Sequence, residues 1–178
     1  MSSTKLISGH AIPLLGLGTW QMRGQQCTEV VQMALDMGYR HVDTAHMYAN
    51  QVEVGAGLRA SGVATDEVFV TTKIWHDSLA YDQVHQQFNE CLEMLTLDYV
   101  DLLLIHHPNE SVPLEETLGA FDEIAISGRA RSIGVSNFSP LQVDAAQAAA
   151  SVPIVNNQVE LHVGYYDANF LAHSQRAG

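Results

Sequence analysis

The sequence predicts an α/β fold in which parallel strands alternate with helices. Two observations predict it. Short segments rich in apolar and β-branched residues recur along the chain, and the stretches between them show helical periodicity. The segment 100–106 is almost continuously apolar, which is typical of a parallel strand buried on both faces. Because helical crossovers join the strands, we expect them to be parallel with right-handed connections.

Turn residues divide the first half of the chain into short elements. Gly9 and Pro13 favour a turn between two extended pieces, so the chain is expected to open with a small β-hairpin or cap. Gly38 and Gly62 are placed to end two helices. The predicted elements are a hairpin over 4–18, a helix over 28–37, a strand over 40–44, a helix over 51–60 and a strand over 68–74.

Helix caps mark the elements of the second half. Ser78 can cap the start of the clearest helix, Ser139 precedes a first-turn proline, and Asp167 can cap the last helix. The predicted elements are a helix over 79–95, a strand over 100–106, a helix over 114–126, a strand over 132–136, a helix over 140–150, a strand over 154–160 and a helix that reaches Gly178.

The composition is that of a globular protein and excludes several classes of partner. The chain has 178 residues, of which 47% are hydrophobic and 16% charged, enough for one domain or a piece of a larger one. A formal net charge of -12 argues against binding nucleic acid or an anionic membrane. The start lacks signal-peptide regions and the apolar runs are too short to span a bilayer, so we expect a cytoplasmic protein. Cys27 and Cys91 are expected to be ordinary reduced thiols.

Each predicted strand carries polar residues at its C-terminal end. In a parallel α/β protein these ends share one face, and in barrels that face holds the active site. Polar ends that merely face loops are the alternative, but five successive strands with this feature favour a site. The residues are Asp43, Lys73, His106, Ser136 with Asn137, and Asn157 with Gln158 and Glu160.

Three of these residues, together with Tyr48, fit the polarisation and protonation of a carbonyl group. Asp43 and Lys73 have opposite charges at adjacent strand ends, and Tyr48 follows closely enough to reach back over them. A nearby ammonium stabilises a phenolate, which makes a phenol a usable general acid near neutral pH. His106 can donate a hydrogen bond to a substrate oxygen. Because no serine or cysteine is placed beside a base, acyl transfer is poorly supported.

The nine histidines do not predict a metal site. His106 and His107 are adjacent on a predicted strand, so their side chains should point to opposite faces. His41 and Asp43 share a face, but no third ligand is apparent.

Six ordered motifs cover nearly all of the chain. They are IPLLGLGTW at 12–20, GYRHVDTA at 38–45 with YAN at 48–50, VFVTTKIW at 68–75, YVDLLLIHHP at 99–108, IGVSNF at 133–138 and NQVE at 157–160. With these motifs the chain resembles the aldo-keto reductases, and most of all the bacterial diketogluconate and methylglyoxal reductases.

The resemblance implies an NADPH-dependent reductase on a (β/α)8 TIM barrel, with NADH as the other possible cofactor, acting on small dicarbonyls and keto-sugars. Tyr48 would be the general acid. The implied catalytic residues are Asp43, Tyr48, Lys73 and His106. The implied cofactor contacts are Gly18, Thr19, Trp20, Asp43, Ser136, Asn137 and Gln158. The implied substrate pocket is Trp20, Trp75 and His107, with plain core packing as the alternative for the two tryptophans.

The substrate pocket should be unusually polar, because His107 stands where many aldo-keto reductases have tryptophan.

The length of the chain differs more seriously from what the resemblance implies. A complete barrel needs about 250 residues, whereas this chain supplies about the first five β/α units and the hairpin, as one apparently truncated domain over 1–178. The chain is expected to end where a sixth strand should begin.

The residues that hold the rest of the cofactor in the family belong to later strands. We therefore expect a C-terminal segment or a second chain to complete the barrel, and the isolated chain to bind NADPH weakly and turn over slowly or not at all. Two alternatives stay open: a catalytically silent binding or regulatory protein that uses the reductase scaffold, and a fragment without independent function.

Overall fold

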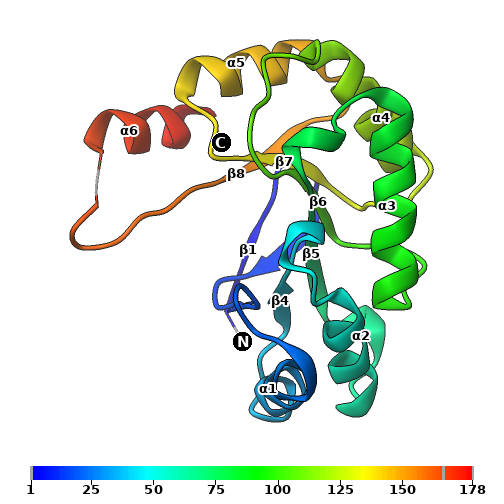
Figure 1. Cartoon of the computed structure of the whole chain (residues 1–178). Helices are drawn as coiled ribbons and strands as arrows, with labels where there is room; N and C mark the ends of the chain where they lie inside the picture. The colour runs from blue at the N-terminus through cyan, green and yellow to red at the C-terminus, as the bar shows by residue number, and fades with distance from the viewer. Residues whose placement is uncertain (1, 166, 178) are drawn as a thin grey trace.

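The computed structural model describes residues 2–165 and 167–177, which form a parallel sheet preceded by a hairpin (Figure 1). Strands β1 (Ser3–Lys5) and β2 (Ala11–Pro13) pair as the antiparallel hairpin. The sheet has the order β3-β4-β5-β6-β7-β8, and each neighbouring pair is parallel. Its strands are Leu17–Gly18, His41–Asp43, Phe69–Ile74, Leu102–Ile105, Ile133–Ser136 and Ile154–Gln158.

The first strand of this sheet corrects the sequence prediction. Residues 17 and 18 were expected in the hairpin, but Leu17 pairs with Val42 and Gly18 with Asp43 in parallel register. Strand β8 is therefore the sixth strand of the sheet, and the expectation that the chain ends before a sixth strand is wrong. A two-residue strand has no alternation of apolar and polar side chains, so only its pairing identifies it.

One α-helix follows each strand of the sheet. The helices are α1 (Gly24–Asp36), α2 (Gln51–Ala60), α3 (Tyr81–Leu95), α4 (Leu114–Ile126), α5 (Pro140–Ala149) and α6 (Ala168–Ala177). Short 3-10 turns are η1 (His46–Tyr48), η2 (Thr65–Glu67) and η3 (His76–Ser78). Figure 1 shows α1 to α5 in order around the outer side of the sheet. In the described part of the chain, no helix has the length and apolar character needed to cross a bilayer.

Most of the predicted N-terminal caps and helix-ending glycines are confirmed. Ser139 and Gln142 form a capping box at the start of α5, with Pro140 in the first turn. The Asp167 carboxylate accepts hydrogen bonds from two backbone N–H groups at the start of α6. The expected end of that helix, Gly178, lies outside the described residues. The glycines that follow three helices have positive φ, as a left-handed helix end requires: Gly38, Gly62 and Gly128.

Two helix starts differ from the prediction. Helix α1 begins at Gly24 rather than at residue 28. Ser78 does not cap α3, which begins at Tyr81 after Ala80. Ser78 lies in η3 instead, where its Oγ accepts a hydrogen bond from Gln87 Nε2 at 2.9 Å. The short turn shifts the helix start by two residues, which side-chain periodicity alone does not reveal.

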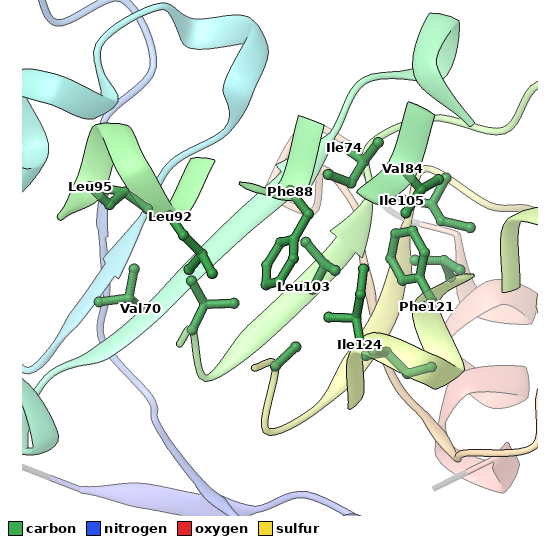
Figure 2. Packing of buried hydrophobic residues seen from close by; sticks show 14 of the residues in the cluster. Val70, Ile74, Val84, Phe88, Leu92, Leu95, Leu103, Ile105, Phe121 and Ile124 are labelled. Atoms are coloured by element: carbon green, nitrogen blue, oxygen red, sulfur yellow. The ribbon is translucent and has the colours of Figure 1, made fainter. Parts of the chain in front are cut away.

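The main core lies between the outer face of the sheet and the helices. Figure 2 shows Phe88 of α3, Phe121 of α4 and Leu103 of β6 in this core, and all three are fully buried. Burial of such a side chain stabilises the fold by about 1.5–3 kcal/mol. A smaller cluster on the inner face consists of Phe69, Leu102, Leu104 and Val155. Two residues of the hairpin, Leu6 and Ile12, pack against it. The hairpin thus packs against the N-terminal part of the inner face.

Candidate active site

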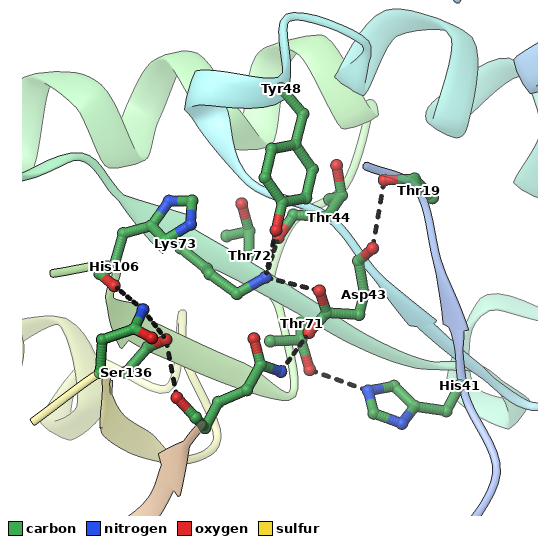
Figure 3. Close-up of polar contacts among 12 residues, drawn as sticks. Thr19, His41, Asp43, Thr44, Tyr48, Thr71, Thr72, Lys73, His106 and Ser136 are labelled. Atoms are coloured by element: carbon green, nitrogen blue, oxygen red, sulfur yellow. Dashed lines mark hydrogen bonds and ion pairs between the residues drawn. The ribbon is translucent and has the colours of Figure 1, made fainter. Parts of the chain in front are cut away.

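The four residues expected to be catalytic lie together at the C-terminal ends of the strands (Figure 3). Lys73 on β5 donates hydrogen bonds from Nζ to Asp43 Oδ1 at 2.5 Å, to the Thr44 carbonyl at 3.0 Å and to Tyr48 OH at 3.3 Å. An ammonium has three hydrogens, so these three acceptors fix its position. Lys73 is fully buried, and Asp43 is its charge partner.

Tyr48 approaches this lysine from η1 rather than from a strand. Its ring lies 5.0 Å from Lys73 Nζ, measured to the ring centroid, and 5.6 Å from the His106 ring centroid. Since Tyr48 OH accepts from Lys73, its own proton is left to donate elsewhere. Among the described residues, no acceptor takes it. The arrangement can therefore deliver a proton from Tyr48 to a bound molecule.

His106 follows β6 and is buried, with 6% of its surface exposed. Burial, together with the nearby Lys73 ammonium and His107, lowers the pKa of His106 from 6.5 to about 4. The ring is therefore neutral at pH 7 and can donate one hydrogen bond. Its Nδ1 is buried with no hydrogen-bond partner among the described residues.

The two tryptophans line this site. The Trp20 ring lies 5.0 Å from the Tyr48 ring between centroids, and Trp75 lies 5.1 Å from His106 at 81°. Trp20 is 50% exposed, which excludes plain core packing for this residue. Trp75 is half-buried.

His107 corrects an expectation drawn from strand alternation. Its ring stacks on the His106 ring with centroids 5.2 Å apart and an interplanar angle of 19°. Strand β6 ends at Ile105, so the two histidines lie beyond the strand and do not alternate. Within the described ranges, no group of three or more His, Cys, Asp or Glu residues is placed to hold a metal ion.

The polar residues at the ends of β7 and β8 adjoin the four residues expected to be catalytic. Ser136 Oγ donates to the Gln158 carbonyl at 2.9 Å, and Asn137 Nδ2 donates to the His106 carbonyl at 3.0 Å. Asn137 has φ 62°, a left-handed conformation that asparagine tolerates. Gln158 Nε2 donates to Asp43 Oδ2 at 2.7 Å, so both carboxylate oxygens of Asp43 are engaged.

The loop after β3 reaches the same place. Thr19 donates from its backbone N and from Oγ1 to the Asp43 carbonyl, at 2.9 and 3.1 Å. Gly18 is the sheet partner of Asp43. Of the expected cofactor contacts, Gly18, Thr19, Ser136 and Gln158 thus adjoin Asp43 or its partners directly.

Two polar residues at the predicted strand ends lie away from the site. Asn157 hydrogen-bonds to the backbone N and O of Phe138, because it alternates with Gln158 and faces the other side of the sheet. Glu160 pairs with His162 in the exposed loop after β8.

Sequence reasoning missed Thr44 and Asn50 as parts of the site. Asn50 is 1% exposed, and its Nδ2 donates to the carbonyls of Thr19 at 2.7 Å and Met22 at 3.1 Å. Its Oδ1 accepts from Thr44 Oγ1 at 3.2 Å. Asn50 therefore ties the loop that carries Trp20 to the residue whose carbonyl holds Lys73. The position of Asn50 in the YAN motif could have identified it as a site residue. Thr44 acts through its backbone carbonyl, which every residue has, so the sequence gives no sign of its role.

Comparison with known proteins places this geometry in a family. The sequence model described as "Aldo/keto reductase family" matches residues 14–172. The methylglyoxal reductase DkgB of Escherichia coli O157:H7 is 42% identical over 154 residues, which are 85% of this chain and 58% of that protein. The glyoxal reductase of Bacillus subtilis is 38% identical over 161 residues, 90% of this chain and 58% of that protein.

Solved structures share the fold. The Bombyx mori aldo-keto reductase, solved in complex with NADP, has a TM-score of 0.92 and 35% identity over 99% of this chain and 64% of that one. The predicted barrel-type fold and the predicted resemblance are thereby confirmed. The chain spans about 58% of the length of the two curated relatives.

Proposed function

The chain belongs to the aldo/keto reductase family, and we propose that it carries the catalytic residues of an NADPH-dependent reductase of small carbonyl compounds. NADH is the alternative cofactor. The observation that carries the proposal is the contact between the Lys73 ammonium and Tyr48 OH, with Asp43 as the charge partner of that ammonium. The similarity to methylglyoxal and glyoxal reductases supports small dicarbonyls as substrates, with keto-sugars as the second class.

Each of the four residues has one task in this proposal. NADPH, when bound, would supply the hydride that the carbonyl carbon accepts. Tyr48 donates its proton to the carbonyl oxygen, and Lys73 stabilises the phenolate that remains. Asp43 holds Lys73 in place through the 2.5 Å contact. His106, neutral at pH 7, donates a hydrogen bond that orients the same oxygen.

The polar groups beside Asp43 fit the nicotinamide end of the cofactor. A carboxamide needs both donors and acceptors, and Ser136, Asn137 and Gln158 offer a hydroxyl and two amides. These three residues would hold the carboxamide. Gly18, Thr19 and Trp20 would approach the cofactor and substrate from the loop after β3, and Trp20, Trp75 and His107 would line the substrate pocket.

The complete protein would need further strands. In the described chain, β3 and β8 each pair with one neighbouring strand, so each has one edge without a partner strand. Unpaired edges of a parallel sheet favour association with another strand. We propose that strand–helix units from a C-terminal continuation or a second chain close the sheet between β8 and β3.

Tyr48→Phe tests the proposed chemistry. The test protein is this chain continued by the C-terminal part of the E. coli relative, and the readout is NADPH consumption with methylglyoxal. Loss of a general acid should lower kcat about 100- to 10,000-fold, while the Kd for NADPH stays within twofold. Retained turnover in the variant would refute Tyr48 as the acid.

The 178-residue chain without this continuation should bind NADPH weakly. A Kd for NADPH in the micromolar range or tighter would contradict that.

A further inference from the structure

Thr72 and Lys73 are consecutive residues of β5, so their side chains point to opposite faces of the sheet. Lys73 pairs in register with Leu104 of the inner cluster. Thr72 pairs in register with Leu103, which belongs to the main core under the helices. The Lys73 ammonium, which contacts Tyr48 (Figure 3), and the Thr72 hydroxyl therefore lie on opposite sides of one strand.

The segment 48–51 contacts both sides of β5. Tyr48, at its start, accepts a hydrogen bond from Lys73 Nζ at 3.3 Å. Gln51, at its end and first in α2, donates a hydrogen bond from Nε2 to Thr72 Oγ1 at 2.6 Å. Because these partners are neighbours on the strand, the two contacts hold the segment against β5 from both of its faces.

The turn between these two contacts contains a strained residue. Ala49 has a φ of 52° and a ψ of 38°, the left-handed region that a residue with a Cβ rarely adopts. Strained backbone persists only where surrounding contacts hold it, and it is concentrated at functional sites. Asn50 holds the turn against the loop after β3. The bond from Gln51 to Thr72 holds it against β5.

The hydrogen bond between Gln51 and Thr72 is shielded from water. Thr72 is fully buried, Gln51 is 1% exposed, and the buried thiol of Cys91 lies against both side chains. Gln51 Oε1 has no hydrogen-bond partner among the described residues, so the bond from Nε2 anchors this side chain. A buried donor that loses its acceptor is left unpaired, which is costly. Loss of the Thr72 hydroxyl should therefore move Gln51 and the turn before it.

We propose that Gln51 is a positioning residue, whose bond to Thr72 sets the place of the Tyr48 hydroxyl relative to the Lys73 ammonium. Gln51 acts through the turn that carries Tyr48 and lies outside the proposed substrate pocket. This inference rests on the proposed reductase function. Proton transfer needs the donor within hydrogen-bond reach of the acceptor, and a displacement of about 1 Å can lower the rate about 100-fold. Loss of the bond should therefore lower kcat and leave KM nearly unchanged.

Thr72→Val tests the proposal in the completed protein, in which the C-terminal part of the E. coli relative continues this chain. Valine keeps the shape of threonine but cannot accept the bond from Gln51. We expect kcat with methylglyoxal to fall about 10- to 100-fold, with KM within about twofold. Thr72→Ser keeps the hydroxyl and should keep kcat close to that of the unchanged protein.

Thr117→Val is the matched control, which separates positioning from loss of stability. Thr117 in α4 is buried, and its Oγ1 donates to the Leu79 carbonyl at 2.7 Å. Both valine variants delete one buried hydroxyl hydrogen bond, so urea unfolding should show similar losses of stability. Only Thr72→Val should lower kcat. An unchanged kcat in Thr72→Val, or an equal fall in Thr117→Val, overturns the proposal.

A second measurement uses the chain as it is and needs no turnover. Hydrogen exchange followed by NMR reports opening of the turn through the amides of Tyr48 and Ala49, both hydrogen-bonded within it at 3.1 Å. Thr72→Val should speed their exchange about 2- to 12-fold, the effect of one net hydrogen bond, and Thr117→Val should not. Unchanged exchange in Thr72→Val overturns the proposal. If the completed protein did not reduce methylglyoxal, the proposed function would fail, while exchange still decided whether Gln51 holds the turn.

Discussion

Gln158 donates a 2.7 Å hydrogen bond to the Asp43 carboxylate, although β8 and β4 lie four strands apart in the sheet. Neighbouring strands are about 4.8 Å apart, so four steps across a flat sheet would cover about 19 Å. The sheet is therefore curled until its sixth strand faces its second across the inner side. This curvature brings the charge partner of Lys73 to the amide of β8.

Gln158→Ala should destabilise the chain by about 1.5–3 kcal/mol, because the lost bond has a charged acceptor. Urea unfolding measures the loss. The control is Gln86→Ala, since Gln86 donates to the Glu90 carboxylate within one exposed helix face. Such a helical pair is worth about 0.2–0.5 kcal/mol. Equal losses in the two variants would contradict a stabilising role for the contact across the sheet.

Lys73→Met should cost about 3–5 kcal/mol, because it leaves the partly buried Asp43 carboxylate without its cation. Asp43→Asn together with Lys73→Met removes both charges and should cost less than the sum of the single changes. A double-mutant cycle by denaturant unfolding measures the coupling. Strict additivity would show that the two charges do not stabilise each other.

His106 should make stability depend on pH. Its pKa of about 4 lies below the ordinary 6.5, so the unfolded chain takes up this proton first as the pH falls. The stabilising contribution is complete above pH 6.5 and is lost as the pH falls towards 4, by at most about 3 kcal/mol. Urea midpoints from pH 7.5 to 4 should fall less steeply in His106→Phe. Parallel curves would refute the low pKa.

Asn50→Ala should release the loop that carries Trp20. The change removes three hydrogen bonds of a buried side chain, at a cost of about 2–4 kcal/mol. In a Trp75→Phe background, acrylamide should quench Trp20 fluorescence more strongly after the change. Asn89→Ala is the control, because Asn89 makes an exposed contact with Arg129. Unaltered quenching would show that Asn50 does not position Trp20.

Gly57→Ala should separate α1 from α2. A Cβ at Gly57 would lie 2.7 Å from the Thr28 carbonyl oxygen and 2.7 Å from Val31 Cβ. Both distances are too short for non-bonded atoms, so the backbone of α1 or α2 would have to move. We expect a loss of about 1–3 kcal/mol from overpacking. Gly119→Ala in α4 meets nothing within 4 Å and should stabilise by about 0.5–1 kcal/mol. Thermal melts compare the two; a stabilising Gly57→Ala would contradict the close contact.

Local signals account for what could be predicted of the elements. The β-branched run of β5 and the spacing of Phe88 and Leu92 in α3 depend on residues a few positions apart. The same holds for the capping box at Ser139, which lies within four residues. Such short-range preferences are written in the chain itself, so the alternation of strands and helices followed from them.

The pairing of the strands and the curvature of the sheet could not be predicted from these short-range preferences. Strand β3 is recognised only by its register with β4, and the stacked His106 and His107 rings follow from the end of β6 at Ile105. The register shift that pairs Val135 of β7 with Asn157 of β8 likewise cannot be read from either strand alone.

The chemistry at the strand ends can be read directly from the residues: a carboxylate, a lysine, a histidine and amides, with a tyrosine nearby. Which of these side chains touch one another depends on how the sheet folds in three dimensions. Asp43 meets Gln158 across 115 residues of chain because the sheet curls, and Lys73 meets Tyr48 because η1 folds back over β5. Contacts between distant residues depend on the summed packing of the whole sheet, which no short stretch of residues encodes.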